Sequence, residues 1–256
     1  MTRWRLLIDG RADGVRNMAI DRAILDAHEA GEAPPTVRLY RWRQPTVSIG
    51  RFQDQTDVDR GYCAAHGIDI CRRPTGGRGV LHDDELTYAV VAGTADGVPA
   101  GTAASYRWLC AALVEAYRIL GVDATLTARA RGVQGAGACY LHATPADLSL
   151  GAAKLSGSAQ VWHRSSVLQH GSLVLTRTVE REAAAFRLGA EEAAALAAST
   201  STIVGALGAR PSSAALQSAV IEGFERALGI LLEPGVVDKK EAARVEALEP
   251  SFVVPE

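Results

Sequence analysis

The segment Arg72–Gly93 constrains the fold more than any other part of the chain. It begins with the loop Arg-Arg-Pro-Thr-Gly-Gly-Arg-Gly and continues into the apolar and β-branched run Leu86–Ala92. Pro74 fixes φ in the loop, while the glycines allow a backbone that residues with a Cβ would resist. Because the following run has the composition of a buried strand, we expect a rigid loop joined to a core strand.

The loop is compatible with two roles. Its bare amides and flanking arginines can hold a carboxylate, a phosphate or an extended acyl chain, or it can be an ordinary hairpin with a solvated basic tip. It matches neither standard phosphate-binding pattern, because Walker A needs Gly-Lys-Ser/Thr and the dinucleotide fingerprint needs a helix directly after the glycines. The residues alone leave a binding loop and a plain hairpin open.

Hydrophobic periodicity predicts further strands and helices along the chain. Strand-like runs lie at Trp4–Ile8, Thr36–Trp42, Pro45–Gly50, Ile68–Cys71, Val122–Ala128, Lys154–Gln160 and Val167–Leu175. Helical patterns lie at Asn17–Glu29, Asp57–His66, Ser105–Leu120, Glu180–Ala198, Ser212–Leu228 and Asp238–Leu248. Asn17 is placed to cap the first helix. Since only helices are expected after Thr176, we predict a catalytic domain over residues 1–178 and a helical extension packed on it over residues 179–256.

Composition limits the class and the compartment. The 256 residues suit one large domain, or a domain with a small appendage, with 48% hydrophobic and 22% charged residues. A net charge of −2 gives no drive toward nucleic acid or an anionic membrane, and no apolar run approaches membrane-spanning length. The start of the chain has no signal-peptide pattern, and the four cysteines are widely spaced without a Cys-x-x-Cys pair. We therefore expect a cytoplasmic protein with reduced thiols.

The loop and its strand resemble a specific signature. Arg72-Arg-x-Thr-Gly-Gly-Arg-x-Val-Leu-His-Asp-x-Glu-Leu-Thr-Tyr88 is similar to that of the biotin/lipoate protein ligase and lipoyl-transferase superfamily, and within it most resembles the LipM-type octanoyltransferases. Asn17-Met-Ala-Ile-Asp21 also resembles the family's first helix. The resemblance implies an α/β (α+β) fold, in which a mixed β-sheet core is flanked by helices, with a helical C-terminal cap.

Cys139 is the expected nucleophile. It ends the Gly-rich stretch Gly132–Tyr140, and a thiol on such a loop becomes reactive when a cation or backbone amides stabilise its thiolate. The plain alternative is a structural cysteine. LipM-type enzymes carry their acyl-accepting cysteine in an Ala-Cys-aromatic segment, ahead of a Gly-x-Lys-x-x-Gly-Ser-Ala-Gln element. Ala138-Cys139-Tyr140 and Lys154–Gln160 occupy those places in that order.

Lys154 is similar to the signature lysine of the superfamily. Its ammonium would stabilise the thiolate and polarise a thioester carbonyl, whereas an exposed, solvated lysine is the ordinary alternative. No other charge lies between Ala152 and Ala159, which favours the site role. One departure is Ala153, because the residue before this lysine is often basic in the family.

The resemblance also implies a set of substrate-binding residues, all within the motifs quoted above or in the strand pair that follows. They are Arg72, Arg73, Thr75, Gly76, Gly77, Arg78, His82, Gly157, Ser158, Ala159, Gln160, His170 and Gly171. The two histidines can either orient the loop by hydrogen bonds or transfer protons. No His, Asp or Glu group has metal-ligand spacing, so no metal is expected. The acyl transfer that the resemblance implies needs no cofactor.

The leading hypothesis is an octanoyltransferase that works through a Cys139 thioester without ATP. Its implied partners are octanoyl acyl carrier protein as donor and a lipoyl-domain protein, such as the glycine cleavage H protein, as acceptor. The second hypothesis is an ATP-dependent lipoate–protein ligase, disfavoured because Phe52 stands where ligases carry the Asn of a Gly-Arg-Asn-Gln element. The third is a non-catalytic carrier-binding relative, disfavoured because Cys139 and Lys154 are both present. The acceptor's identity, the choice of octanoyl over lipoyl and the oligomeric state stay open.

Overall fold

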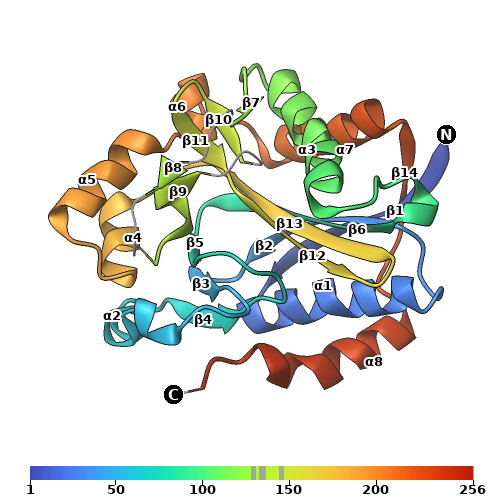
Figure 1. The fold of residues 1–256 in the computed structure, drawn as a ribbon, viewed down its shortest axis with the longest axis horizontal. Helices are drawn as coiled ribbons and strands as arrows, with labels where there is room; N and C mark the ends of the chain where they lie inside the picture. The colour runs from blue at the N-terminus through green and yellow to red at the C-terminus, as the bar shows by residue number, and fades with distance from the viewer. Residues whose placement is uncertain (128–130, 133–136, 144–146, 256) are drawn as a thin grey trace.

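A six-stranded mixed sheet forms the centre of the molecule (Figure 1). The computed structural model describes residues 1–127, 131–132, 137–143 and 147–255. The strands, in order across the sheet, are β12 (Ser158–His163), β13 (Ser166–Val174), β6 (Glu85–Gly93), β2 (Thr36–Trp42), β1 (Thr2–Ala12) and β14 (Ile230–Pro234). β1 is parallel to β2 and β14, whereas β2, β6, β13 and β12 pair antiparallel in turn. The α/β fold with a mixed sheet is confirmed.

Strand β6 is buried along its whole length. It pairs with β13 from Glu85 opposite Val174 to Gly93 opposite Ser166, and with β2 on its other edge. A strand paired on both edges and covered on both faces satisfies all its backbone groups inside the protein. The core strand predicted at Leu86–Ala92 is confirmed, and the Gly-rich loop before it is anchored to the centre of the fold.

Helices α3 (Thr102–Ile119) and α7 (Ser213–Leu228) pack together on one face of the sheet, above it in Figure 1. Tyr88 and Val90 of β6 share a hydrophobic cluster with Phe224 of α7. Ser212 caps α7 by accepting a hydrogen bond from the Ala215 amide, as the Ser212 start of the predicted helix required.

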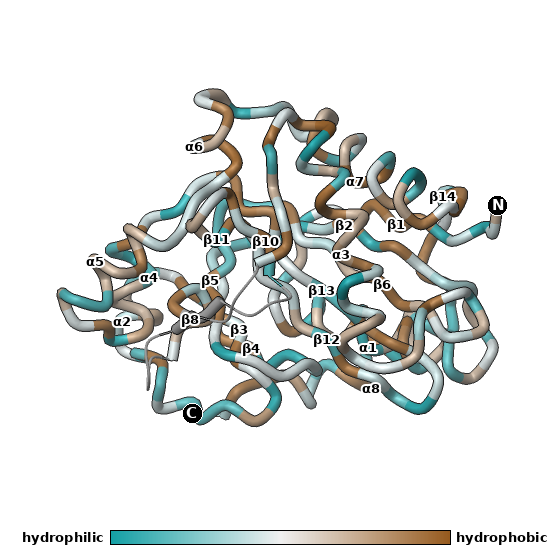
Figure 2. The backbone as a smooth tube through the Cα atoms, turned by 45° about the horizontal axis from the view of Figure 1, so that its top comes forward, coloured by the Kyte–Doolittle hydropathy of each residue, from teal (hydrophilic) through white to brown (hydrophobic). Residues whose placement is uncertain are grey.

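Helices α1 (Gly14–Glu29) and α8 (Lys239–Leu248) cover the opposite face, below the sheet in Figure 1. Ala89 and Val91 of β6 lie in this second cluster with Ile24 of α1, because side chains alternate between the faces of a strand. The hydropathy colouring in Figure 2 alternates along α7, as expected of a helix that packs by one face.

Smaller sheets beside the main sheet carry the loops of the candidate site. One has the order β4-β3-β5, with β4 Asp69–Arg72, β3 Thr46–Ile49 and β5 Val80–His82. Another has the order β11-β10-β7, with β11 Ala153–Ser156, β10 Leu148–Leu150 and β7 Thr125–Leu126. Strands β8 (Arg131–Gly132) and β9 (His142–Ala143) form a pair, and the 3₁₀ turn η3 (Cys139–Leu141) lies between them in sequence.

The C-terminal region is joined closely to the main sheet. Its helices are α4 (Val179–Ala185), α5 (Ala190–Ser199), α6 (Ile203–Leu207), α7 and α8. The single helix predicted at Glu180–Ala198 is therefore two, separated by extended backbone at Gly189. Strand β14, which was not predicted, adds an edge to the sheet beside β1. The division of the chain after residue 178 stays a prediction.

Three local expectations also need correction or restriction. Asn17 is not the cap of α1: the helix begins at Gly14 with Asp13 before it, and the buried Asn17 amide donates to carbonyl oxygens of the neighbouring strands. Helix α2 is short, Arg60–Ala65, and follows a separate 3₁₀ turn. Parts of two predicted segments, at residue 128 and at residues 133–136, lie outside the described residues.

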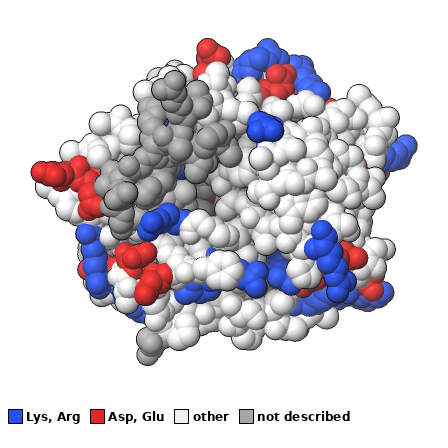
Figure 3. All heavy atoms as spheres, in the orientation of Figure 1, with Lys and Arg blue, Asp and Glu red and all other residues white. Residues whose placement is uncertain are grey.

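The surface shows mixed charge. In Figure 3, Lys and Arg side chains form a broken line across the lower half of this face with Asp and Glu among them, and much of the remaining described surface is uncharged. Within the part of the chain that the structure describes, no helix is both long and apolar enough to cross a membrane.

Candidate active site

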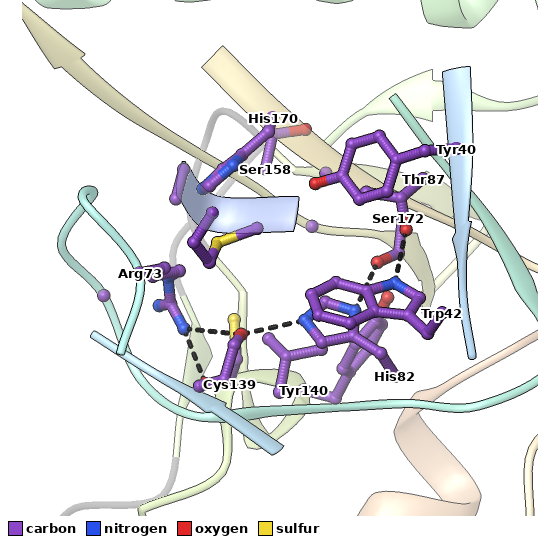
Figure 4. A pocket seen from close by; sticks show the side chains of 17 residues that line it. Tyr40, Trp42, Arg73, His82, Thr87, Cys139, Tyr140, Ser158, His170 and Ser172 are labelled. Atoms are coloured by element: carbon purple, nitrogen blue, oxygen red, sulfur yellow. Dashed lines mark hydrogen bonds between the residues drawn. The ribbon is translucent and has the colours of Figure 1, made fainter. Parts of the chain in front are cut away.

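A partly open cavity lies between the main sheet, α1 and the Gly-rich loop. Its exposed lining is mainly apolar, and Figure 4 shows Arg73 and Cys139 on one side with Tyr40 and Trp42 on the other. The lining residues are Met18, Tyr40, Trp42, Ser48, Arg73, Gly77, Val80, His82, Thr87, Cys139, Tyr140, Gly157, Ser158, Ala159, His170, Gly171 and Ser172.

Arg73 holds the Gly-rich loop in shape. Its buried guanidinium donates to the carbonyl oxygens of Ser48, Gly76 and Arg78 at 2.7 to 2.9 Å. Gly77 adopts φ +93°, in the left-handed region that favours glycine. The hydrogen bonds from Arg73 to backbone carbonyl oxygens therefore fix the loop conformation before substrate binds.

Arg72 performs a similar task on the neighbouring loop. Its guanidinium donates to the carbonyl oxygens of Gly50, Arg51 and Gln53 at 2.7 to 3.1 Å, and it does not line the cavity. Gly50 faces the Gly-rich loop so closely that a Cβ there would lie 2.0 Å from the carbonyl oxygen of Gly77. The two loops thus pack through backbone contacts that only glycine permits.

Cys139 is attached directly to the Gly-rich loop. Its amide donates to the carbonyl oxygen of Gly79 at 2.7 Å, and the Gly79 amide donates to Gly137 at 3.0 Å. Ala138 and Gly79 form a parallel bridge. These bonds place a half-buried thiol in the cavity wall, at a position fixed relative to the loop.

Lys154 lies beside this thiol, with its Nζ 3.7 Å from Cys139 Sγ and 3.3 Å from the Cys139 carbonyl oxygen. The same Nζ is 3.0 Å from Asp147 Oδ2, and both side chains are almost fully buried. Burial would lower the pKa of Lys154, but Cys139 and Asp147 outweigh it and raise the pKa above its ordinary value. We call Cys139, Asp147 and Lys154 the lysine group; at neutral pH it contains an ammonium ion.

The other cysteines differ from Cys139 in exposure. Cys63, Cys71 and Cys110 are fully buried. Burial raises the pKa of Cys63 to about 11 and that of Cys71 to about 12, so neither forms a thiolate at neutral pH. Burial also raises the pKa of Cys110. Cys139 is the one cysteine of the four that is not fully buried.

A second buried group joins α1 to the Gly-rich loop through His170. Thr75 Oγ1 donates to His170 Nε2 at 2.7 Å, and His170 Nδ1 lies 3.0 Å from Asp21 Oδ2. Burial lowers the pKa of His170, so the ring is neutral at pH 7 and donates through Nδ1 to the carboxylate. Arg38 Nη1 binds the other oxygen of Asp21 at 2.7 Å. The Asp21 network consists of Asn17, Asp21, Arg38, Tyr40, Thr75 and His170.

His82 belongs to a third polar group centred on Glu85. Its Nδ1 lies 2.8 Å from Glu85 Oε1, its Nε2 lies 2.8 Å from Ser48 Oγ, and its ring stacks on Trp42 at 4.0 Å. Burial would raise the pKa of Glu85, but His82 and the hydroxyls of Thr87 and Ser172 lower it below its ordinary value. The carboxylate is therefore charged and orients the histidine.

The structure brings together many of the expected site residues. Those that line the cavity are Arg73, Gly77, His82, Cys139, Gly157, Ser158, Ala159, His170 and Gly171. The others lie behind or beside it. Thr75 binds His170, Gly76 accepts from Arg73, Gln160 bonds to Gln169, and Arg78 is exposed at the rim of a neighbouring hollow. These positions are described, while the substrate roles stay proposals.

Sequence reasoning missed several contributors. Met18, Tyr40, Trp42 and Tyr140 line the cavity, and Asp147 contacts Lys154. Met18 and Tyr40 lie in segments with the apolar pattern of an ordinary helix and an ordinary strand. This pattern does not show whether a side chain lines a cavity or packs in the core. Asp147 had one usable signal, since it is an acidic residue shortly before the signature lysine.

One grouping with metal-ligand character lies away from this cavity's lining. Asp26, Glu29 and His163 offer ligand atoms within 4.8 Å of one another, among the described residues. Sequence spacing could not reveal it because His163 is distant along the chain. Asp26 is paired with Arg22, and Glu29 with His163 and Arg164. The expectation of no metal stays untested.

The fold matches that of solved lipoate protein ligases. The chain matches the lipoyl protein ligase A/B catalytic domain over residues 13–225, and it belongs to that family. The superfamily resemblance noted at Arg72–Tyr88 is confirmed. Within the family, octanoyltransferase LipM of Kyrpidia tusciae is 37% identical over 269 residues, which cover 100% of this chain and 98% of the relative.

Further comparisons agree over the same length. Octanoyltransferase LipM of Symbiobacterium thermophilum is 39% identical over 259 residues, covering 96% of this chain and 94% of the relative. A solved structure of a bipartite lipoate protein ligase with its E2 lipoyl domain, from Thermoplasma acidophilum, superposes with a TM-score of 0.81 at 25% identity. It covers 98% of this chain and 93% of the ligase chain.

Proposed function

We propose that this chain is an octanoyltransferase of lipoate biosynthesis, which passes an octanoyl group through Cys139 to a lysine of a lipoyl domain. The proposal is supported by full-length relatives named octanoyltransferase LipM. The observation that carries its mechanism is the Lys154 ammonium, 3.7 Å from Cys139 Sγ in the wall of a mainly apolar cavity. The donor is octanoyl acyl carrier protein, and the acceptor is a lipoyl-domain protein such as the glycine cleavage H protein.

In the first step the Cys139 thiolate attacks the thioester carbonyl carbon of the donor. A new S–C bond forms, and the carbonyl electrons move to the oxygen, whose charge the adjacent ammonium stabilises. The tetrahedral adduct then collapses and breaks the bond to the carrier sulfur. The carrier leaves as a thiol after taking a proton from the Lys154 ammonium, whose Nζ is 3.7 Å from Cys139 Sγ.

In the second step the neutral ε-amine of the acceptor lysine attacks the Cys139 thioester. An amide bond forms, the bond to Sγ breaks, and Cys139 returns to its thiolate. The attacking nitrogen loses one proton, which restores the proton given to the carrier in the first step. The overall exchange is thioester plus amine to amide plus thiol, so no ATP is required.

The octanoyl chain occupies the cavity between Trp42 and the Gly-rich loop. Met18, Trp42 and Val80 provide apolar contact along it. Arg73 and Arg72 keep the two glycine loops rigid by binding their carbonyl oxygens. A preformed apolar cavity lowers the ordering penalty of binding a flexible chain.

The direct test is transfer from octanoyl acyl carrier protein to a lipoyl domain, with and without ATP. We expect wild type to transfer without ATP, and Cys139→Ser to lose transfer while keeping its circular dichroism spectrum. Cys63→Ala is the matched control, since it removes a buried thiol that does not line the cavity. Substantial activity in Cys139→Ser, or transfer by wild type only with ATP, would favour a lipoate–protein ligase instead.

A further inference from the structure

Asp147 is a buried carboxylate that sequence reasoning did not select. Its Oδ2 lies 3.0 Å from Lys154 Nζ, and the two side chains are 4% and 3% exposed. Removing a carboxylate and an ammonium from water is expensive unless each is compensated by its partner. A pair this buried, ending 3.7 Å from the candidate nucleophile, therefore constrains the charge at that nucleophile.

The backbone fixes the distance between the two charges. Asp147 precedes β10 and Lys154 lies on β11, which pair antiparallel with Ser149 opposite Lys154. The Thr127 amide donates to the Asp147 carbonyl oxygen at 2.8 Å, which ties this point to the end of β7. A Cβ at Gly157 would lie 3.1 Å from Lys154 Cε and 3.5 Å from Asp147 Oδ1, so glycine there leaves room for the pair.

Several acceptors lie close to the ammonium of Lys154. Nζ is within reach of Asp147 Oδ2, the Cys139 carbonyl oxygen and Cys139 Sγ. The ring of Tyr140 lies beneath the same nitrogen at 5.1 Å. An ammonium has three N–H donors, and one of its hydrogen bonds is to the Cys139 sulfur.

We propose that Asp147 is a positioning residue, which keeps Lys154 protonated and directs its ammonium at Cys139. The inference rests on the proposed roles of Cys139 and Lys154 in octanoyl transfer. Asp147 contacts neither the thiol nor the acyl group in this scheme; it acts through the lysine.

The charges around Lys154 give Asp147 a particular role during turnover. Burial favours the neutral amine, while the Cys139 thiolate and Asp147 favour the ammonium. When Cys139 becomes acylated its negative charge is lost, and Asp147 is the carboxylate that remains beside the lysine. Arg73 is a further buried cation near Cys139; burial lowers the pKa of Arg73, and the charge of Cys139 acts against this. Asp147 thus favours the ammonium form of Lys154 before the first step, and favours its return to that form when the lysine regains its proton in the second step.

A merely structural ion pair would give the same coordinates. In that case Asp147 would only stabilise the β10–β11 hairpin. Its removal would then lower the stability of the protein and leave the reactivity of the Cys139 thiol in the folded protein unchanged. The two roles separate in a measurement on the thiol of the folded, substrate-free protein, where Cys139 attacks iodoacetamide and releases iodide. The other three cysteines are fully buried, so alkylation reports on Cys139.

The experiment compares the alkylation rate against pH for wild type, Asp147→Asn, Lys154→Ala and the double variant. We expect Asp147→Asn to raise the midpoint pH of the alkylation profile by about one unit. The alkylation rate at neutral pH would then be about tenfold lower than in wild type. Asp147→Glu should recover part of the shift. In the Lys154→Ala background, Asp147→Asn should not move the midpoint up again, because the lysine through which Asp147 favours the thiolate is absent.

Glu241→Gln is the matched control for stability. It breaks the buried ion pair between Arg5 of β1 and Glu241 of α8, and neither residue lines the cavity. It should lower the melting temperature and leave the alkylation profile unmoved. If Lys154→Ala shifts the profile but Asp147→Asn does not, the positioning role is wrong and the proposed site stands. If neither variant shifts it, the lysine–thiol assignment behind the proposed function is wrong as well.

Discussion

The Asp21 network and the lysine group are both buried, charged and in contact with the same cavity, yet they end differently. In the Asp21 network, His170 uses one ring nitrogen on Asp21 and the other on Thr75. In the lysine group, Lys154 ends on Cys139, a thiol that is half-buried in the cavity wall. In the Asp21 network both ring nitrogens of His170 are bonded to other members of the network, whereas the lysine group includes the Cys139 sulfur at the cavity wall.

This difference separates scaffolding from chemistry. A buried charge network with every member paired makes the structure around it rigid. The Asp21 network does this for the Gly-rich loop, since it connects α1 to Thr75 through His170 of β13. A charged group that ends on an accessible nucleophile can stabilise charge that changes during a reaction. Variants of the two groups should therefore fail in different assays.

Lys154→Ala should produce the largest loss of chemistry. Without the ammonium, neither the thiolate nor the oxyanion of the tetrahedral adduct is stabilised. We expect acylation of Cys139 to slow by about 10²–10³-fold, as on removal of one preorganised oxyanion donor. Single-turnover kinetics with octanoyl acyl carrier protein measure this rate. Lys240→Ala, at an exposed position on α8, is the control, and an acylation rate equal to wild type in Lys154→Ala would contradict the account.

Asp21→Asn should instead reduce stability while leaving the thiol profile in place. It leaves Arg38 buried with one fewer carboxylate, and breaking such a buried pair lowers the free energy of unfolding by about 3–5 kcal/mol. Urea unfolding measures this loss. Asp26→Asn on the same helix removes a half-buried pair with Arg22 and should change stability by about 1 kcal/mol or less.

The stability difference should also depend on pH in a stated direction. Burial would raise the pKa of Asp21, but Arg38 and His170 hold it below the ordinary value of 3.8. A carboxyl with a lowered pKa in the folded state stabilises the protein above its unfolded pKa, and this contribution is lost as pH falls through the folded pKa. The gap between wild type and Asp21→Asn should therefore be constant near neutral pH and narrow in acid below about pH 4. A stability difference between wild type and Asp21→Asn that widens in acid would contradict the lowered pKa of Asp21.

The sequence predicted the elements whose signals are local. The apolar run Leu86–Ala92 became β6, and the Ser212 start with Gly229 at the end framed α7 as expected. Cys139 and Lys154 were predicted as site residues because each lies in a motif of the family and the two motifs follow in the family's order. In the fold, Lys154 Nζ lies 3.7 Å from Cys139 Sγ. Strand β14 was missed because a short apolar run between two helices has too little periodicity to identify it.

Partners from distant segments could not be predicted. Asp21 and His170 are far apart in sequence, and no spacing rule joins them. Arg72 shows a related limit, because an arginine beside a Gly-rich loop has the same sequence pattern whether it binds a substrate or the backbone. Which atoms receive its donors depends on how Gly50 and the neighbouring loop pack, which only the folded chain determines.

The central claim is that the acyl group rests on the thiol of the lysine group, and mass spectrometry of the intact protein tests it most directly. The chain is mixed with octanoyl acyl carrier protein, without lipoyl domain, ATP or magnesium. We predict a gain of one octanoyl group on Cys139, removed by hydroxylamine as a thioester is, and discharged to a lipoyl-domain lysine when that domain is added. Octanoylation of the lipoyl domain that requires ATP, with no acylated Cys139 at any time, would contradict the account.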